Sequence, residues 1–325
     1  MLTFVRCCLL PAIKLYLLGL WVLLGQLFSK TFRLPEMPRQ EGKVAIVTGG
    51  SRGIGFEVAL HLAGLGAHVI IGGRDEQEGL SAVAKIREEH REAKVEFITL
   101  DLGSMQSVRH FVQCFKERNL PLNILVNNAG IMLVPEGRTE DGFELHFGVN
   151  YLGHFLLTWL LLDHLKQSGM LDCFSRVVHV SSSAHRIGEI KLNDLNSEYY
   201  SAHAAYCQSK LAQLLFSAHL QKALRAGAFT ASSFAVDPGM VHTALYRHIW
   251  APLRLALGVV AQLLFWTPKE GAATVLYAAL SPALDGERAG GYWANGRRQM
   301  TSPPTSDLRL QRSLWETSAR MLGLQ

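Results

Sequence analysis

The sequence of 325 residues predicts an α/β fold, in which helices cover both faces of a single doubly wound parallel sheet. Short apolar runs alternate with segments of helical spacing along most of the chain, and no internal repeat interrupts the alternation. The apolar share of 49% suits one large domain with apolar additions. The net charge of +5 is spread out without a basic, aromatic-rich cluster, so we expect no nucleic-acid partner.

The first strand and the first helix of this sheet are expected on either side of a glycine-rich loop. Residues 43–47 form a β-branched apolar run that predicts a buried parallel strand, and residues 56–66 have helical spacing. The loop between them, Thr48 to Gly55, completes the strand–turn–helix context of a Rossmann-type dinucleotide site. Its glycines would let the backbone approach a pyrophosphate, which the helix N-terminus attracts. The alternative is a glycine-rich turn that binds no ligand.

The second strand, expected at about residues 68–72, carries the signal for the choice of cofactor. An acidic residue directly after it would bind a free ribose 2′-hydroxyl and repel a 2′-phosphate. Here Gly73 and Arg74 follow the strand, and Arg52 adds a positive charge from the glycine-rich loop. Two arginines can hold a phosphate, so NADP(H) is the preferred cofactor. Asp75 keeps NAD(H) open, and Arg74 could also be a solvated surface residue.

Tyr206 and Lys210 form a pair with the chemistry of an acid–base catalyst. Their i, i+4 spacing places both side chains on one face of an expected helix. A neighbouring ammonium lowers the pKa of a phenol, and such a phenol can exchange a proton with an alcohol. The plain alternative is a tyrosine packed on a lysine stem. The glycine-rich loop and a run of three serines, residues 181–183, favour the catalytic interpretation.

These segments together resemble the short-chain dehydrogenase/reductase family over about residues 43–295. The ordered motifs that match are Thr48, Gly49, Gly53 and Gly55; Asp101-Leu102; Asn127-Asn128-Ala129-Gly130; Asn150; Ser182; Tyr206 and Lys210; and Pro238-Gly239 with Thr243. With the arginines, the expected cofactor-binding set is Thr48, Gly49, Ser51, Arg52, Gly53, Ile54, Gly55, Arg74, Asp101, Leu102, Asn128, Ala129, Gly130, Tyr206, Lys210, Pro238, Gly239 and Thr243.

The resemblance implies hydride transfer between a nicotinamide and an alcohol or carbonyl carbon, without a metal. Tyr206 would be the general acid or base, and Lys210 would lower its pKa and hold the ribose. Ser182 would donate a hydrogen bond to the substrate oxygen, and Asn150 would hold a water that links Lys210 to solvent. Because side chains alternate along a strand, Ser182 faces away from its neighbours; Ser183 is the second choice.

Within the family, the segments around Ser182 and Tyr206 resemble the retinol dehydrogenase branch. Over the whole domain the chain is most similar to members that oxidise polyprenol with NAD and reduce dolichal with NADPH. The resemblance therefore implies a lipid alcohol or aldehyde as substrate, with retinal or a steroid as alternatives. A redox-inactive NADP-binding scaffold is a further alternative. Relatives usually pair through the helices that carry Asn150 and Tyr206, which makes a homodimer an open expectation.

Residues 1–42 precede the first strand and contain an apolar segment, and residues 43–325 are expected to form the enzyme domain. The 22 residues from Cys7 to Phe28 could span a membrane if Lys14 snorkels to the surface. No small-residue cleavage site follows, so we favour an uncleaved anchor over a removed signal peptide of a secreted protein. An apolar helix packed on the enzyme's own surface is the third reading. The excess of basic residues after the segment predicts that the enzyme domain lies on the cytosolic side of the membrane. We expect this membrane to be that of the endoplasmic reticulum, with lipid droplets as a further location.

A second apolar stretch, from Trp250 to Trp266, lies within an expected flap at about residues 240–267. It is too short to span a membrane. It could be a lid that takes up a lipid from the membrane surface, or ordinary core or dimer packing. The five cysteines have neither metal spacing nor an even disulfide framework, which suits a reducing compartment.

Overall fold

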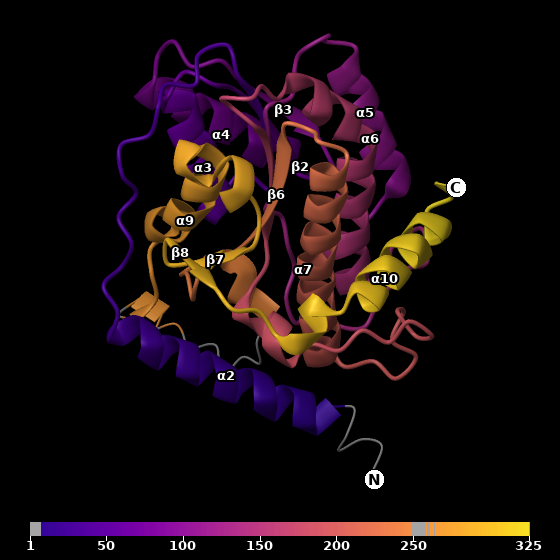
Figure 1. Ribbon diagram of the computed structural model, residues 1–325. Helices are drawn as coiled ribbons and strands as arrows, with labels where there is room; N and C mark the ends of the chain where they lie inside the picture. The colour runs from indigo at the N-terminus through magenta and orange to yellow at the C-terminus, as the bar shows by residue number, and fades with distance from the viewer. Residues whose placement is uncertain (1–7, 249–257, 259–260, 263, 325) are drawn as a thin grey trace.

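The strands of the described chain form one sheet in the order β3-β2-β1-β4-β5-β6-β7-β8 (Figure 1). The computed structural model describes residues 8–248, 258, 261–262 and 264–324. Seven strands are parallel, and β8 is antiparallel to β7. The strands are β1 Val44–Thr48, β2 His68–Gly73, β3 Val95–Thr99, β4 Ile124–Asn127, β5 Ser175–Val180, β6 Ala231–Asp237, β7 Tyr292–Ala294 and β8 Arg297–Gln299.

Helices cover both faces of the sheet, as the alternating pattern predicts. One face carries α3 Gly53–Gly64, α4 Glu76–Glu89 and α9 Pro268–Leu280; the other carries α5 Met105–Lys116, α6 Gly153–Ser168 and α7 Ala202–Ala226. Short helical turns are η2 Phe147–Leu152, η3 Ser183–Ile187, η4 Ala244–His248, η5 Pro282–Leu284, η6 Gly286–Arg288 and η7 Pro303–Ser306. Every residue of β1 is buried because the sheet has an apolar layer on each side. The predicted doubly wound α/β fold is confirmed.

Strand order reverses between β1 and β4, since β2 and β3 lie on one side of β1 and β4 to β8 on the other. Ligands of such sheets bind in the crevice at the carboxyl ends of the strands, at this switch point. The glycine-rich loop follows β1 there, and the Asn128-Ala129-Gly130 segment follows β4. The sheet topology therefore brings these two predicted segments together. The expected flap lies partly outside the described residues.

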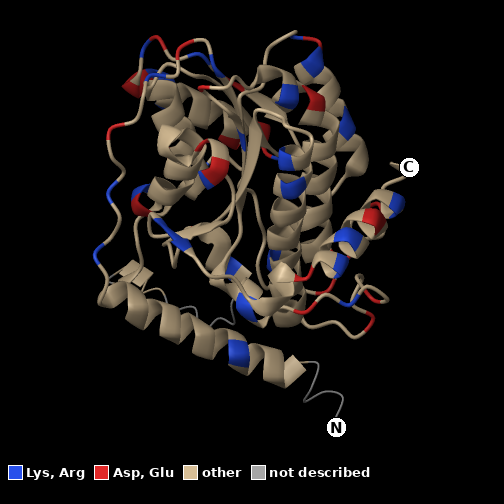
Figure 2. Cartoon of the chain, viewed as in Figure 1, with Lys and Arg blue, Asp and Glu red and all other residues tan. Residues whose placement is uncertain are grey.

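Helix α2, Leu10–Leu27, is the apolar N-terminal segment and lies along the surface of the domain (Figure 1). Lys14 is its one charged residue, and Figure 2 shows the rest of the helix free of charge. By length and composition it could cross a membrane, with a mean hydropathy of 1.6. Every residue of α2 is described, and only Gln26 is buried.

The chain between α2 and β1 is attached to the enzyme domain. Asn295, in the turn between β7 and β8, accepts a hydrogen bond from the Phe32 amide (2.7 Å) and donates one to the Lys30 carbonyl (3.0 Å). The Phe32 ring packs edge-on against Tyr277, and Met37 is buried in the core on the α3 face. Two side chains of the linker thus belong to the packing of the domain.

Helix α10, Leu308–Met321, packs against α6 and α7. Its Trp315 ring lies 5.0 Å from the ring centroid of Phe155 in α6 and 4.8 Å from that of His219 in α7. The hydroxyls of Ser318 and Tyr151 are hydrogen-bonded at 2.8 Å. The C-terminal helix therefore buries aromatic side chains on the two helices through which relatives are expected to pair.

Candidate active site

The glycine-rich loop needs its glycines for geometry. Gly49 and Gly53 have φ angles of +65° and +58°, in the left-handed region that favours glycine. A Cβ at Gly55 would lie 2.3 Å from the Gly49 carbonyl oxygen, so no side chain fits there. Among the residues that the structure describes, no side chain caps the N-terminus of α3, so its first amides can serve an anionic ligand. The loop has the shape that a pyrophosphate requires.

Thr48 connects this loop to the segment after β4. Its Oγ accepts hydrogen bonds from the amides of Asn128 (2.9 Å) and Ala129 (3.0 Å). The Asn128 side-chain amide donates to the Thr48 carbonyl at 2.8 Å. Two motifs some eighty residues apart in sequence thus form one floor of the candidate site.

The charged residues near the carboxyl end of β2 do not all have the roles that their positions in the sequence suggest. Asp75 caps helix α4, where its Oδ1 accepts the Glu78 amide at 2.9 Å. Arg52 forms an exposed ion pair with Glu78 at 3.0 Å. Arg247, in η4, was not singled out from the sequence. Burial is the largest cause of its lowered pKa, and the nearby charges of Arg52 and Arg74 lower that pKa further. Three arginines therefore surround this end of the site.

Tyr206 lies on α7, beside Ser182 at the start of η3. Burial raises the pKa of Tyr206 above its usual value, and hydrogen bonding with Ser182 acts in the opposite direction. The neighbouring serines have other partners: Ser181 donates to the Lys210 carbonyl at 3.0 Å, and Ser183 donates to Asp237. The structure therefore places the middle serine of the run next to the phenol.

Lys210 lies one turn beyond Tyr206 and is buried. Its Nζ donates to the Val180 carbonyl at 2.9 Å and to Gln213 Oε1 at 3.0 Å, and it lies 5.9 Å from the Tyr206 ring centroid. Burial lowers the pKa of Lys210 to about 8. The sequence predicts that this ammonium lowers the pKa of Tyr206. In the structure burial outweighs any such effect, because the ammonium points to carbonyl oxygens and not to the phenol.

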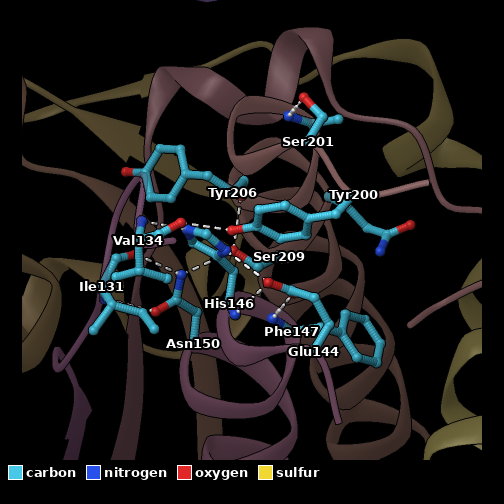
Figure 3. A network of polar contacts seen from close by, with 12 residues as sticks. Ile131, Val134, Glu144, His146, Phe147, Asn150, Tyr200, Ser201, Tyr206 and Ser209 are labelled. Carbon is cyan, nitrogen blue, oxygen red and sulfur yellow. Dashed lines mark hydrogen bonds and ion pairs between the residues drawn. The ribbon is translucent and has the colours of Figure 1, made fainter. Parts of the chain in front are cut away.

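Asn150 lies in the π-helical turn η2, a type of distortion that is frequent at functional sites. Its side chain holds the segment after β4, since Oδ1 accepts the Ile131 amide (2.8 Å) and Nδ2 donates to the Ile131 carbonyl (3.0 Å). Nδ2 also donates to Ser209 on α7 at 2.9 Å (Figure 3). Asn150 therefore fixes the loop and α7 relative to each other.

His154 links Asn150 to Thr48. Burial lowers the pKa of His154 to about 4, so the ring is neutral at pH 7. Its Nδ1 lies 3.0 Å from the Asn150 carbonyl and its Nε2 lies 2.9 Å from Thr48 Oγ. In the tautomer that satisfies both contacts, Nδ1 donates and Nε2 accepts. A neutral histidine thus ties the asparagine to the glycine-rich loop.

Glu144 and His146 form a second buried group next to Tyr206. Glu144 accepts hydrogen bonds from His146 Nδ1 and from the Phe147 amide, both at 2.7 Å (Figure 3). The His146 ring lies 6.3 Å from that of Tyr206, edge to face. Tyr200, stacked on the other side, donates to the Val134 carbonyl at 2.6 Å. Glu144 therefore fixes the His146 ring, and this ring packs against Tyr206.

Asp237, at the end of β6, is a further site residue that the sequence reasoning missed. Its carboxylate accepts hydrogen bonds from the Gly239 amide and the Tyr292 hydroxyl, both at 2.9 Å. It is buried, and its charge raises the pKa of Lys210 and of Tyr206. An acidic residue directly before Pro238-Gly239, at the carboxyl end of a strand, was the signal that could have identified it.

One cavity of about 1070 Å³ is lined by most of the predicted site residues. It extends from Arg74 and Asp101 past the glycine-rich loop to Tyr206 and Lys210. Asp101 and Leu102, Gly130, Gly239 and Thr243, all predicted to bind the cofactor, line it or follow its edge. The structure therefore brings the predicted site residues around a common space, except Thr48 and Asn150, which are buried and lie outside the described lining.

A family model described as "short chain dehydrogenase" matches residues 43–253. The chain belongs to this family. Short-chain dehydrogenases bind a nicotinamide dinucleotide. The cavity of this one fits the group, because Gly49, Gly53 and Gly55 of the loop line it without side chains that would block a pyrophosphate. This short-chain dehydrogenase is an oxidoreductase that uses NAD or NADP.

Two named relatives are similar over nearly the whole chain. The protein is 55% identical to a polyprenol dehydrogenase of Danio rerio over 319 residues, which covers 98% of both chains. It is 42% identical to human retinol dehydrogenase 12 over 285 residues, or 87% of both chains. Among solved structures, an NADP complex of RhlG from Pseudomonas aeruginosa has a TM-score of 0.63 and 27% identity, covering 80% of this short-chain dehydrogenase and 99% of that chain.

Proposed function

We propose that this short-chain dehydrogenase interconverts the alcohol and the carbonyl of a long-chain isoprenoid lipid, oxidising polyprenol and reducing dolichal. The observation that supports this best is the single cavity in which Tyr206 and Ser182 face an apolar space next to a dinucleotide loop. The polyprenol dehydrogenase relatives, 55% and 48% identical, supply the substrate class.

The side chains have the following roles in carbonyl reduction. Tyr206 gives its hydroxyl proton to the carbonyl oxygen, and in oxidation it takes that proton back. Ser182 Oγ accepts the Ala184 amide at 3.2 Å, so its own hydrogen can be donated to the oxygen as negative charge develops there. When bound, the nicotinamide supplies or accepts the hydride.

Lys210 and Asn150 position the reacting groups. The Lys210 ammonium would hold the hydroxyls of the nicotinamide ribose. Asn150 keeps the segment after β4 fixed against α7, and its main-chain carbonyl is held by His154. The water relay that family resemblance assigns to Asn150 would start from this fixed position. The glycine-rich loop and the α3 N-terminus would bind the pyrophosphate.

NADP(H) is the proposed preference. Arg52 and Arg74 lie at the adenosine end of the cavity, and Arg247 adds a third guanidinium from η4. An arginine fork suits the two charges of a ribose 2′-phosphate. Asp75, the residue that would favour NAD(H), uses one carboxylate oxygen to cap α4. NAD(H) would still be accepted in the same cavity, without the phosphate contacts.

We further propose that α2 attaches the enzyme to the endoplasmic reticulum membrane, with the catalytic domain in the cytosol, and that lipid droplets are a second location. The apolar composition of α2 supports attachment, and the basic residues after it support the orientation. Imaging of the tagged full-length protein tests this location: overlap with a marker of the endoplasmic reticulum is expected, and overlap with another organelle alone would contradict it.

The activity is tested with purified full-length protein in detergent. Dolichal and all-trans-retinal are offered in parallel with NADPH, and NADH serves as the cofactor control. Faster turnover of dolichal is expected. Preference for retinal would favour the second candidate, a retinal reductase, which the 42% identity to retinol dehydrogenase 12 supports. NADPH binding without turnover of either aldehyde would indicate a redox-inactive scaffold.

A further inference from the structure

Helix α2 borders the catalytic cavity. Leu15 packs against a small apolar cluster whose members include Tyr206, Met132 and Leu133. Seven residues of the helix line the same cavity as Ser182 and Lys210: Leu15, Tyr16, Leu18, Gly19, Leu20, Val22 and Leu23. The segment that looks like a simple anchor in the sequence is thus also a wall of the site.

The two sides of α2 have different surroundings. Leu15, Leu18, Gly19 and Val22 recur at intervals of three and four residues, so they share one helix face, and this face lines the cavity. Leu17 and Trp21 follow the opposite side and are 62% and 63% exposed. An apolar face with this exposure in a chain that carries a membrane-type helix is suited to lipid.

Both ends of α2 are tied to the same domain. Near its C-terminal end, Gln26 Oε1 accepts the Met240 amide at 2.5 Å and Nε2 donates to the Met240 carbonyl at 3.3 Å. Toward the other end, the Tyr16 ring packs edge-on against His203 at 5.5 Å. Before the helix starts, the Cys8 thiol contacts the Tyr200 carbonyl at 3.6 Å.

These contacts decide how the helix can lie in a membrane. Eighteen residues of α-helix extend about 27 Å, close to the thickness of the hydrocarbon core. A spanning helix would therefore hold its two ends on opposite membrane surfaces, where one cytosolic domain cannot contact both. A helix fastened at both ends to that domain instead lies along the membrane plane, with its outer face in one leaflet.

We infer that α2 is a substrate-binding element: it lies in one leaflet, and its inner face guides the hydrocarbon chain of the lipid from the bilayer to Tyr206. This inference rests on the proposed function, since it requires a long-chain substrate. Leu15, Leu18 and Val22 offer the chain an apolar surface that continues to the catalytic cluster. A hydrocarbon tail fits this lining because its residues carry no charge.

Two glycines of α2 provide a matched test. A Cβ at Gly19 or at Gly25 would meet nothing within 4 Å among the described residues, so a larger side chain is tolerated at both. Gly19 lines the cavity, and Gly25 is outside its described lining. Gly19→Phe is expected to lower kcat/KM for dolichal about tenfold or more. It should lower kcat/KM for an aldehyde of one isoprene unit far less, and Gly25→Phe should leave kcat/KM for both aldehydes unchanged.

The outcomes separate the two proposals. If wild-type protein reduces dolichal and the two glycine variants behave alike, the wall role of α2 is wrong and the proposed function stands. If wild-type protein reduces only the short aldehyde, the proposed function fails, and the role of α2 in guiding a long chain fails with it.

The position of α2 in the membrane has a test that needs no turnover. Epitope tags at both ends of the full chain are digested with protease in sealed microsomes, before and after the membranes are opened. Digestion of both tags in sealed vesicles is expected, because both ends of α2 lie on the side of the enzyme domain. Protection of the N-terminal tag alone would show a spanning helix and overturn the inference.

Discussion

Tyr206 is buried and lines the cavity beside Ser182, so its hydroxyl can exchange a proton with a molecule bound in that cavity. Tyr206→Phe removes the hydroxyl and keeps the ring that packs against His146. Turnover is expected to fall by a factor of about 10² to 10⁴, the usual contribution of a general acid. NADPH affinity, measured by fluorescence titration, should change little. Retained turnover would refute the proton-transfer role.

Arg74 is expected to recognise the phosphate that distinguishes NADPH from NADH. Arg74→Asp replaces a fork of donors with a charge that repels phosphate, so the Kd for NADPH should rise by about tenfold to a hundredfold. The Kd for NADH should change far less. Arg91→Asp, at an exposed turn outside the described cavity lining, is the control for the change in net charge. An equal loss for both nucleotides would contradict the phosphate contact.

Asp237 gives the site a pH dependence with a predictable sign. Burial lowers the pKa of Lys210 to about 8, and the Asp237 carboxylate acts against this shift. The ammonium form is the one that holds the ribose, so kcat/KM for NADPH, which reports the free enzyme, should fall as the pH rises through about 8. Asp237→Asn removes the charge that supports the ammonium, so the midpoint of the pH profile should move to lower pH. An unmoved midpoint would show that another group titrates.

At the residue scale, motif residues could be named from the sequence because their spacing is fixed by strand ends and helix turns. Asp237, Glu144 and Arg247 could not, since their importance comes from neighbours that only the fold supplies. The prediction that the pKa of Tyr206 is lowered was wrong for the same reason, because the burial that raises this pKa was not visible in the sequence.

The attachment of the linker after α2 sets how the protein can be shortened. Removal of residues 1–28 leaves Phe32 and Met37 in place, whereas removal of residues 1–38 deletes a buried core side chain as well. Loss of a buried methionine costs about 2–5 kcal/mol, so the longer deletion should unfold at a clearly lower temperature. Thermal unfolding of the two proteins compares them directly.

Both shortened proteins should be released from vesicles in a flotation assay, because both lack α2. If the more stable one still floats with lipid, the segment around residues 240–267 is a second attachment.

Elements themselves were largely predictable. The first two strands begin and end within one residue of the expected positions, because β-branched runs are bounded by turn residues. Helix α3 begins three residues earlier than expected, since the last glycines of the loop form its first turn. Packing of α2 on the enzyme's own surface was one of three alternatives, but the surface on which it packs could not be predicted, because a helix that is apolar on all sides carries no signal for it.

For the whole molecule, α10 decides how copies of the chain can meet. Trp315 and its neighbours cover aromatic side chains of α6 and α7, the helices through which the family resemblance leads us to expect pairing. We therefore expect a monomer in mild detergent, measured by analytical ultracentrifugation. Removal of residues 307–325 should expose Phe155 and Phe216 and cause self-association. Arg312→Ala, which breaks only an exposed ion pair with Glu316, is the control. A stable wild-type dimer through α6 and α7 would contradict this expectation.

The pair of hydrogen bonds between Gln26 and Met240 has a thermodynamic consequence. Met240 directly follows Gly239, in the segment expected to contact the nucleotide. The two hydrogen bonds therefore join α2, which faces the membrane, to a loop that is expected to bind the nucleotide. If binding of α2 to lipid raises the affinity of the enzyme for the nucleotide by some factor, the nucleotide must raise the affinity of the enzyme for lipid by the same factor. The bilayer would then act as an effector of this enzyme. Detergents that lift α2 from the domain would yield a protein that binds NADPH more weakly than the same protein on vesicles.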